Sequence, residues 1–446
     1  MIEPIKLYPH QERALKATEN LNRVAYYHDM GLGKTFTGSE KMMRLGAKVN
    51  LLICQKSKIP DWIEHFKNHY MVRVLDLRNT KQLDEFHGLA AGERFTVVGI
   101  INYELAWRRK PLLDVEGFTL MLDESSLIQN RKAKQTKFIL KLKPANVILL
   151  SGTPTAGKYE NLWSQLHLLG WPISEQLYNR QYVNWDTLWI GGMPIKTVDK
   201  KDPYKNIERL KEKMREYGAD FLKTEECFEL PTQTFIPIMC ETSKDYKKFM
   251  RNGIIQMDDH ELVGNTTLVK HLISRQLCGN YSASKLTAFR DLLESTNDRV
   301  IVFYNFNTEL LELTQIAKDL NRPVSIINGE HKILNAYRKE SNSVTLIQYQ
   351  AGAMGLNLQL ANKIVYFTPP ERCELWMQSQ KRIHRIGQGR PCYYYKLICK
   401  GSVEESIYNA LDRGVDYTDE LFRKDEENEQ RRKRPGRKRR ISTCAG

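Results

Sequence analysis

The stretch Asp29-Met30-Gly31-Leu32-Gly33-Lys34-Thr35 decides the fold of this chain. It follows an apolar run at residues 24–27, which predicts a short buried strand, and it precedes residues 36–44, which predict a helix. Glycines between a strand and a helix let backbone N–H groups and the helix N-terminus approach an anion. In such a loop the Lys34 side chain reaches the β- and γ-phosphates of a nucleotide, and the Thr35 hydroxyl holds Mg²⁺. The stretch therefore predicts a phosphate-binding loop.

One position departs from the general pattern of such loops. His28 stands where the pattern has its first glycine. A glycine turn that caps an ordinary helix is therefore the alternative interpretation of the stretch, and the motifs further along the chain decide between the two.

Composition excludes membrane and secreted classes. No apolar run approaches the roughly 18 residues of a membrane span, and the first residues, Met1-Ile2-Glu3-Pro4, lack a signal-peptide pattern. Eight cysteines are scattered without a C-x-x-C pair, which predicts reduced core thiols and no zinc site. We expect a cytoplasmic protein of a bacterial or phage-infected cell, or a nuclear one if the source is eukaryotic.

The charge of the chain predicts a polyanionic partner. The formal net charge is +15, and residues 431–440 contain eight Lys or Arg and no acid. A basic body with a basic tail favours nucleic acid as the partner. A solvated tail without a specific partner is the alternative.

Strands and helices alternate along most of the chain, which predicts an α/β fold with parallel sheets. The rhythm holds to about residue 170, breaks over 171–230, and resumes after Pro231. We expect an N-terminal lobe at residues 1–170, an irregular insertion at 171–230, a C-terminal lobe at 231–425 and a disordered basic tail at 426–446.

Two acids follow an apolar strand predicted at residues 118–122. Asp123 and Glu124 would then lie at the carboxyl edge of a parallel sheet, where ligands bind. One carboxylate can hold Mg²⁺, and the other can orient or deprotonate an attacking water. An acidic surface loop is the alternative. The small polar run 151–154 follows the next predicted strand. Its side chains can transmit a change at the nucleotide to another surface of the protein.

A second group of polar residues lies late in the chain. A helix predicted at residues 374–385 places Gln378, Arg382 and Arg385 on one face. Two guanidinium groups and an amide suit the charge that develops on a γ-phosphate. A surface ion-pair cluster is the alternative. Near the N-terminus, Gln11 carries an amide that suits an adenine edge, or it is an ordinary surface residue.

The order of these segments resembles the Swi/Snf-type ATPases of helicase superfamily two, which translocate on double-stranded DNA. Residues 29–35 resemble motif I, with Asp29 where Glu is usual, and residues 378–388, reading QSQKRIHRIGQ, resemble motif VI at nearly every defining position. The remaining matches are motif II at 123–124, motif III at 151–154 and a closing brace segment at 401–407. The resemblance covers roughly residues 5–415. Ser126 stands where many members have His.

The resemblance implies two RecA-like lobes with ATP and Mg²⁺ between them. Thr35 and Asp123 would hold the metal, Glu124 would orient the water, and Gln11 would read adenine. Arg382 and Arg385 would reach across as arginine fingers, with Gln378 beside them in the catalytic set. The implied nucleotide-binding positions are Gln11, Asp29, Met30, Gly31, Leu32, Gly33, Lys34, Thr35 and Gly355. The candidate DNA contacts are Lys56, Ser57, Asn102, Tyr103, Asn305 and Gln348.

The resemblance predicts a DNA-dependent ATPase that translocates on duplex DNA, with no membrane and no indicated protein partner. No accessory histone-reading domain is visible in the sequence, so we expect a compact motor that resembles phage and bacterial versions. One alternative is a strand-separating, annealing or fork-remodelling helicase, which needs a strand-splitting pin that the sequence does not reveal. The other is a DNA-binding protein with a degenerate ATPase.

Overall fold

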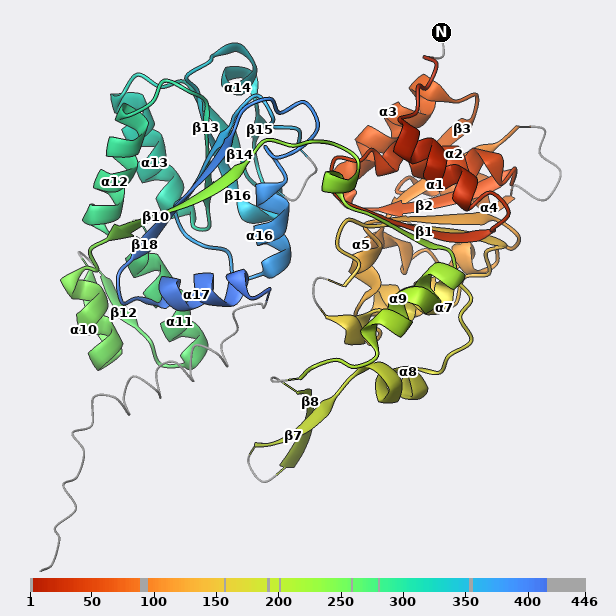
Figure 1. Cartoon of the computed structure of the whole chain (residues 1–446), viewed down its shortest axis with the longest axis horizontal. Coiled ribbons are helices and arrows are strands. Elements are labelled where there is room, and N and C mark those ends of the chain that lie inside the picture. The colour runs from red at the N-terminus through yellow and green to blue at the C-terminus, as the bar shows by residue number, and fades with distance from the viewer. Residues whose placement is uncertain are drawn as a thin grey trace, which may run out of the picture. The chain divides into compact units, whose positions relative to one another are not determined.

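The computed structural model describes residues 3–88, 95–155, 158–190, 193–199, 202–257, 260–279, 281–352 and 356–414 (Figure 1). The chain divides into two compact units, Met1–Leu230 and Pro231–Gly446. Each unit is built around its own seven-stranded sheet. The α/β class with two parallel sheets, predicted from the alternation of strands and helices, is therefore confirmed. Gly355 and the basic tail at 426–446 lie outside the described residues.

The sheet of unit 1 is entirely parallel, in the order β3-β4-β2-β5-β6-β1-β9. Its strands are buried on both faces, which explains why the central ones read as continuous apolar runs. They are β1 (Arg23–His28), β2 (Val49–Cys54), β3 (Arg73–Asp76), β4 (Val97–Asn102), β5 (Thr119–Asp123), β6 (Asn146–Leu150) and β9 (Ala219–Leu222).

Helices cover both faces of this sheet and form two cores. Side chains alternate between the faces along each strand, so Tyr26 packs in one core and Tyr27 in the other. The aromatic pair Trp62 and Phe66 of α3 is buried in the core that contains Tyr26. The helices of unit 1 are α1 (Pro9–Ala17), α2 (Lys34–Arg44), α3 (Ile59–His69), α4 (Thr80–Gly88), α5 (Tyr103–Ala106), α6 (Lys134–Ile139), α7 (Trp163–Leu168), α8 (Glu175–Tyr182) and α9 (Ile207–Glu216), with short 3₁₀ turns η1 (Lys56–Lys58), η2 (Lys110–Leu113), η3 (Ser125–Ile128), η4 (Tyr159–Asn161) and η5 (Thr224–Glu226).

Residues 171–230, expected as an insertion between the lobes, lie within unit 1. Part of the segment completes the sheet, because β9 pairs with β1 in parallel, from Ala25 opposite Ala219 to His28 opposite Leu222. Another part forms an antiparallel hairpin of β7 (Trp185–Ile190) and β8 (Met193–Val198). Figure 1 shows this hairpin projecting away from the seven-stranded sheet. Residues 171–230 therefore contain one part that completes the sheet of unit 1 and another part that projects from it.

The sheet of unit 2 has the order β10-β18-β17-β13-β16-β14-β15 and is parallel except for its last pair. Its strands are β10 (Gln233–Cys240), β13 (Val300–Tyr304), β14 (Val324–Ile327), β15 (Lys332–Ile333), β16 (Val344–Gln348), β17 (Lys363–Tyr366) and β18 (Cys392–Cys399); β11 (Ile254–Met257) and β12 (His260–Val263) form a separate hairpin. The helices are α10 (Lys244–Asn252), α11 (Thr267–Cys278), α12 (Ala283–Glu294), α13 (Asn307–Asp319), α14 (Asn335–Lys339), α15 (Tyr349–Gly352), α16 (Cys373–Gln380) and α17 (Val403–Asp412).

A buried ion pair joins two helices of unit 2. The Lys285 ammonium of α12 lies 2.5 Å from a carboxylate oxygen of Glu404 on α17, and both side chains are almost completely buried. Cys278 and Cys399 are buried beside this pair as free thiols, which agrees with the expected reduced core cysteines. In the described part of the chain, no helix has the length and apolarity needed to span a membrane.

The helix predicted at 374–385 is shorter than expected, because α16 ends at Gln380. Beyond it the backbone bonds to a distant segment: the Leu358 amide donates to the Arg382 carbonyl, and the Gln388 amide side chain donates to the carbonyl of Ala361. These tertiary hydrogen bonds replace the helical ones. Arg382 and Arg385 therefore lie in turns after α16, and the prediction of one shared helical face was wrong.

Candidate functional site

The phosphate loop joins β1 to α2. Gly33 lies in the left-handed region at φ 70° and is the N-cap of α2, whose first turn receives no side-chain cap. A side chain at this position would also collide with the amide of Gln11. Gly31 likewise has a positive φ of 94°. The first N–H groups of α2 therefore receive no side-chain acceptor, which suits the phosphate-binding role that the sequence predicts for this loop.

The Lys34 ammonium lies over this loop. It donates to the backbone carbonyls of His28 at 2.8 Å and Asp29 at 3.2 Å. It also lies 3.4 Å from the place where a Cβ on Gly152 would stand, so the loop after β6 packs against the phosphate loop. The cation is therefore at the carboxyl end of β1, beside the end of β6.

The acid pair follows β5, the neighbour of β6 on its other side. Asp123 accepts a hydrogen bond from the indole N–H of Trp62 at 2.8 Å. Burial raises the pKa of Asp123 above its usual value, and the Trp62 hydrogen bond and the charges of Lys58 and Lys34 oppose that shift. The structure thus places the first predicted carboxylate within the electrostatic reach of Lys34.

Glu124 is held in a left-handed backbone conformation at φ 59°. Residues other than glycine are uncommon in this region, and they cluster at active sites and ligand-binding sites. Its carboxylate accepts hydrogen bonds from the hydroxyls of Ser151 at 3.1 Å and Ser126 at 3.3 Å. The Tyr103 hydroxyl donates to the backbone carbonyl of Asp123 at 2.9 Å and supports the same turn.

Gln165 of α7 connects the three strand ends. Its side-chain oxygen accepts from the Ser125 hydroxyl at 2.8 Å and from the Tyr27 hydroxyl at 3.0 Å, and its nitrogen donates to the Pro154 carbonyl at 2.9 Å. The residue is completely buried. It joins β1, the turn after β5 and the loop after β6, and no motif in the sequence singles it out.

The phosphate loop is also tied to β9. His28 bonds to the Asp220 carboxylate at 2.6 Å, and Asp29 accepts from the amide and hydroxyl of Thr224, each at 3.2 Å. Burial lowers the pKa of His28, while Asp220 acts in the opposite direction. The tether passes through residues that the sequence analysis assigned to an insertion.

The amide of Gln11, expected to read adenine, is engaged with the loop. Its nitrogen donates to the carbonyls of Gly33 at 3.0 Å and Leu32 at 3.3 Å, and its oxygen accepts from the Tyr8 amide at 2.8 Å. The side chain is 2% exposed. In this structure Gln11 supports the phosphate loop, and its recognition of adenine stays a prediction.

The candidate DNA contacts of unit 1 fall into two groups. Lys56 and Ser57 lie in η1 at the end of β2, where Lys56 is exposed. Asn102 and Tyr103 are 5% and 1% exposed, and the Asn102 amide donates to Glu104 at 2.7 Å. Little surface is left at Asn102 and Tyr103 for a nucleic acid, and their contact with DNA stays a prediction.

In unit 2, the predicted arginines lie against the segment at 356–361. Arg382 is 3% exposed, and the Arg385 guanidinium donates to the Leu356 carbonyl at 3.5 Å. Burial lowers the pKa of Arg385. The Gln378 side chain donates to Glu374 at 3.1 Å and is also buried. The three residues are close in sequence, but only Gln378 belongs to α16.

The DNA contacts predicted in unit 2 lie at the carboxyl ends of β13 and β16. The Asn305 amide nitrogen donates to the Thr368 hydroxyl and to the Pro369 carbonyl, each at 2.9 Å. The Gln348 nitrogen donates to the Asn305 carbonyl at 3.1 Å. Both side chains thus hold neighbouring loops in place, and a DNA contact would have to use their remaining surface.

Comparison with known proteins identifies the family. The model of the SNF2-related domain matches residues 14–286, more than half of the chain, and the helicase conserved C-terminal domain matches residues 284–387. The chain belongs to the SNF2-related family. The Swi/Snf resemblance seen in the motif order is therefore confirmed, and the family is one of helicase-like ATPases.

Two curated relatives illustrate the similarity of this SNF2-related chain. It is 23% identical over 86% of its length to the mouse SWI/SNF-related matrix-associated actin-dependent regulator of chromatin subfamily A member 1. It is 25% identical over 67% of its length to the DNA repair and recombination protein RAD26 of Saccharomyces cerevisiae. The chain spans 40% and 31% of these relatives, less than half of either.

A solved structure, the Sulfolobus solfataricus SWI2/SNF2 ATPase core in complex with dsDNA, is 20% identical to the SNF2-related chain and has a TM-score of 0.44. The match covers 94% of this chain and 92% of that one.

Proposed function

We propose that this SNF2-related chain is an ATP-dependent translocase on double-stranded DNA that hydrolyses ATP to ADP and phosphate. One observation carries the proposal. The phosphate loop with Lys34, the acid pair at Asp123 and Glu124, and the Ser151 loop follow three adjacent strands, β1, β5 and β6, in one sheet. A cation and two partly buried carboxylates at one sheet edge, the second held by serine hydroxyls, are the groups that phosphoryl transfer to water needs.

The residues of unit 1 fit ATP and Mg²⁺ as oxygen-rich, charged ligands. The uncapped N–H groups of α2 and the Lys34 ammonium would bind the phosphates, and Thr35 and Asp123 would hold the metal. The bound metal neutralises charge that develops on the phosphate oxygens. Glu124, fixed by Ser151 and Ser126, would orient the attacking water and accept its proton at a carboxylate oxygen.

Unit 2 would contribute the cationic groups. Arg382 and Arg385 would stabilise charge on the transferred phosphoryl group, and Gln378 would help position them. Gly355, which the resemblance places among the nucleotide-binding positions, is proposed as a further nucleotide contact. Changes in the nucleotide would then alter how the two units hold a DNA backbone.

Charge and family together support DNA as the track. The net charge of +15 favours a polyanion, and the candidate contacts that keep exposed surface are Lys56 and Ser57 in unit 1, with Asn305 and Gln348 in unit 2. The basic tail at 426–446 would add phosphate contacts that do not depend on sequence. Such a motor works where duplex DNA is, in a bacterial or phage-infected cytoplasm or in a nucleus.

The test is the ATPase rate of the full chain with no nucleic acid, duplex DNA, single-stranded DNA, forked DNA or RNA. We expect duplex DNA to stimulate turnover most. Greater stimulation by RNA or by single strands would contradict the proposed track. A chain that binds ATP but shows no turnover under any of these conditions would instead be a DNA-binding protein with a degenerate ATPase.

A further inference from the structure

The projecting hairpin of β7 and β8 has a firmly anchored base. Tyr182 and Val183 at its start are buried in unit 1, and Val183 forms a bridge with Tyr204 on the returning chain. The Tyr204 hydroxyl donates to the Glu160 carboxylate at 2.6 Å. The side chains at the base of the hairpin are therefore held in place. A surface that they form is preorganised for binding.

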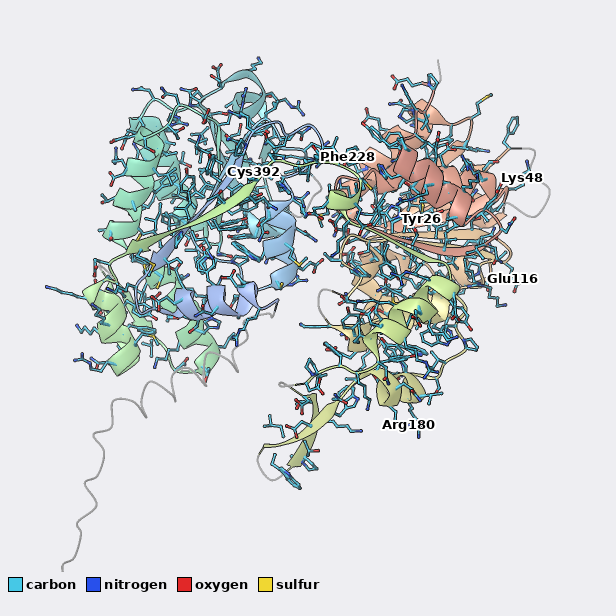
Figure 2. All side chains as sticks on the ribbon, in the orientation of Figure 1. Tyr26, Lys48, Glu116, Arg180, Phe228 and Cys392 are labelled. Carbon is cyan, nitrogen blue, oxygen red and sulfur yellow. The ribbon has the colours of Figure 1, made fainter. Side chains whose placement is uncertain are left out.

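A groove of about 980 Å³ lies between α8 and the base of this hairpin. We call it the hairpin groove. Its lining residues are Ser174, Gln176, Leu177, Asn179, Arg180, Val183, Asn184, Trp185, Lys196 and Lys205. Three of them are cations and none is an acid. Figure 2 shows Arg180 projecting from α8 at the surface of unit 1.

The three cations of the hairpin groove are not neutralised by carboxylates. Among the described residues, Arg180, Lys196 and Lys205 form no ion pair. Asp202 lies near the groove, where its carboxylate accepts from the amide of Asn184 at 3.3 Å. Uncompensated cations on one concave surface favour an anionic ligand.

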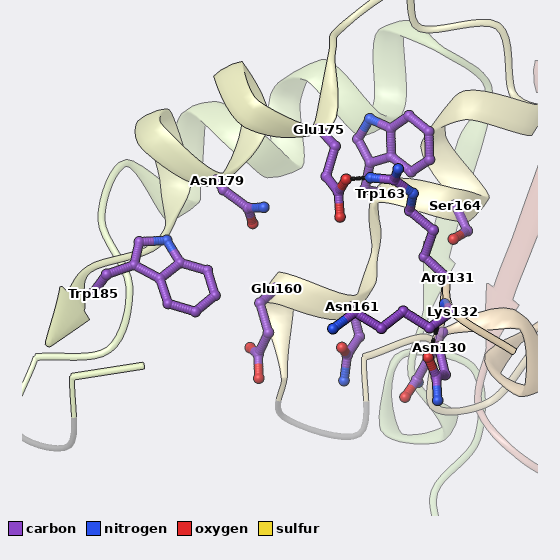
Figure 3. Close-up of a pocket in the computed structure, with 11 residues that line it drawn as sticks. Asn130, Arg131, Lys132, Glu160, Asn161, Trp163, Ser164, Glu175, Asn179 and Trp185 are labelled. Atoms are coloured by element: carbon purple, nitrogen blue, oxygen red, sulfur yellow. Dashed lines mark hydrogen bonds and ion pairs between the residues drawn. The ribbon is translucent and has the colours of Figure 1, made fainter. Parts of the chain in front are cut away.

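A neighbouring cavity in the same unit provides the contrast (Figure 3). It shares Asn179 and Trp185 with the hairpin groove, but its lining also contains Glu160 and Glu175. The guanidinium of Arg131 is paired there with Glu175 and lies 5.3 Å from the centroid of the Trp163 ring. Its charges are therefore compensated within the protein, whereas those of the hairpin groove are not.

An aromatic surface accompanies the cations. The Trp185 indole is 38% exposed, and the Lys196 ammonium lies 5.9 Å from its ring centroid. Trp189, further along β7, is 68% exposed. Leu177, which is 38% exposed, adds apolar surface to the groove. Cations that track phosphates, combined with an indole on which a base can stack, are the features that bind single-stranded nucleic acid.

We propose that the hairpin groove binds an unpaired stretch of a DNA strand. Phosphates would contact Arg180, Lys196 and Lys205, and an exposed base would stack on Trp185. A base within a duplex is already stacked on its neighbours and offers its face to an indole only after local unstacking, which costs a few kcal/mol per step. An unpaired strand offers its base faces without that cost, so the groove fits a strand that has left the duplex. This site goes beyond the proposed motor activity, because it would let the chain hold a junction between paired and unpaired DNA.

The experiment measures nucleotide-free binding of the full chain to an oligo-dT strand, to a blunt duplex of equal length and to oligo-U RNA. The variants are Trp185→Ala, and Arg180→Gln, Lys196→Gln and Lys205→Gln combined. Losing one stacked base should weaken oligo-dT binding about 5- to 100-fold. Losing three phosphate contacts should reduce the slope of log affinity against log salt by about 2 on a single strand. Duplex affinity should change little.

The matched control removes three positive charges elsewhere in unit 1. The control variant combines Arg209→Gln, Lys211→Gln and Lys213→Gln on α9. Lowering the net charge by three weakens attraction to any DNA, and beyond that general loss the control should change oligo-dT affinity by no more than about twofold. An equal loss in this control, a Trp185→Ala chain that binds oligo-dT normally, an equal loss of duplex binding, or a preference for oligo-U would each overturn the proposal.

A measurement on the unaltered chain guards against variants that fail to fold. Photo-crosslinking to iodouracil-substituted single-stranded DNA, followed by peptide mapping, should label Trp185 or a neighbouring groove residue. Labelling confined to other peptides would overturn the proposal. Neither the binding assay nor the crosslinking needs ATP. A negative result for the hairpin groove would therefore not contradict the proposed ATPase, and a failed ATPase test would not contradict binding at the groove.

Discussion

The carboxyl edges of the two parallel sheets carry similar residues and use them differently. At the edge of unit 1, Glu124 accepts hydrogen bonds from two serine hydroxyls and keeps part of its surface. At the edge of unit 2, Glu309 is completely buried and accepts from the amides of Asn305 and Phe306 and from the Thr368 hydroxyl, at 2.8–3.1 Å. The same topological position can therefore serve chemistry or hold loops together.

The two edges differ in the hydrogen-bond partners of their polar side chains. In unit 2, backbone donors occupy one oxygen of Glu309, and the amides of Asn305 and Gln348 bond to neighbouring loops. In unit 1, the acid pair lies beside a lysine and the uncapped start of a helix. A polar residue at a strand end is therefore a site candidate only if the structure leaves it exposed surface and an available charge.

The largest effect should come from Glu124→Gln. The substitution removes the proton-accepting carboxylate and keeps its size, so turnover should fall by a factor of about 10²–10⁴ while ATP affinity is retained. The matched substitution Glu309→Gln at the other edge should leave DNA-stimulated turnover near normal. Steady-state ATPase rates and nucleotide-binding titrations of both variants check this. A loss of ATP affinity in Glu124→Gln would show damage to the loop or metal site instead.

Arg382→Ala and Arg385→Ala should each slow hydrolysis about 10³-fold and change ATP affinity far less, because arginine fingers act on transition-state charge. The control is Arg390→Ala, since Arg390 is about half exposed and pairs with Asp298 at 3.3 Å. Single-turnover hydrolysis at saturating DNA distinguishes a slower chemical step from weaker ATP binding. Near-normal turnover in either finger variant would remove that residue from the proposed site.

Gln165→Leu should have a smaller effect. It deletes the link between Tyr27, Ser125 and the Pro154 carbonyl, so the free energy of unfolding should fall by about 1–3 kcal/mol. Turnover at saturating DNA should fall about tenfold, which corresponds to about 1.4 kcal/mol of lost positioning.

The control for Gln165→Leu is Gln135→Leu, because the Gln135 side chain makes one hydrogen bond, to the Leu127 carbonyl at 2.9 Å. Denaturant unfolding and ATPase assays compare the two variants. Equal loss of turnover in both would mean that Gln165 has no special coupling role.

The smallest effect concerns the pH dependence of the stability of unit 2. Burial raises the pKa of Glu309, so the folded state binds this proton more tightly than the unfolded chain. The resulting stabilisation is complete below the unfolded pKa and is lost as pH rises through the folded pKa; a tenfold difference in proton affinity is worth about 1.4 kcal/mol.

Glu309→Gln removes this titration. Its free energy of unfolding relative to the unaltered chain should therefore increase as the pH rises above the usual glutamate pKa. Denaturant unfolding at a series of pH values measures the difference. A pH-independent difference would mean that Glu309 does not titrate in this range.

The sequence by itself determined the features that depend on short stretches of chain. The phosphate loop was predictable, because a strand, two glycines and a helix start fix the backbone locally. The acid pair was predictable because it directly follows an apolar strand, and the order of the motifs indicated the family. Each of these conclusions needed only neighbouring residues or their order along the chain.

Only the tertiary structure decided which distant residues meet. Thr224 reaches Asp29 and Gln165 reaches Tyr27 because β9 and α7 pack against β1 across more than a hundred residues of chain. The helix expected to run through Arg382 ends early because its backbone finds partners at residues 356–361. The hairpin groove likewise joins α8 to β8. Hydrogen bonds and packing between remote segments compete with local propensity, and a single sequence does not show which segments will be neighbours.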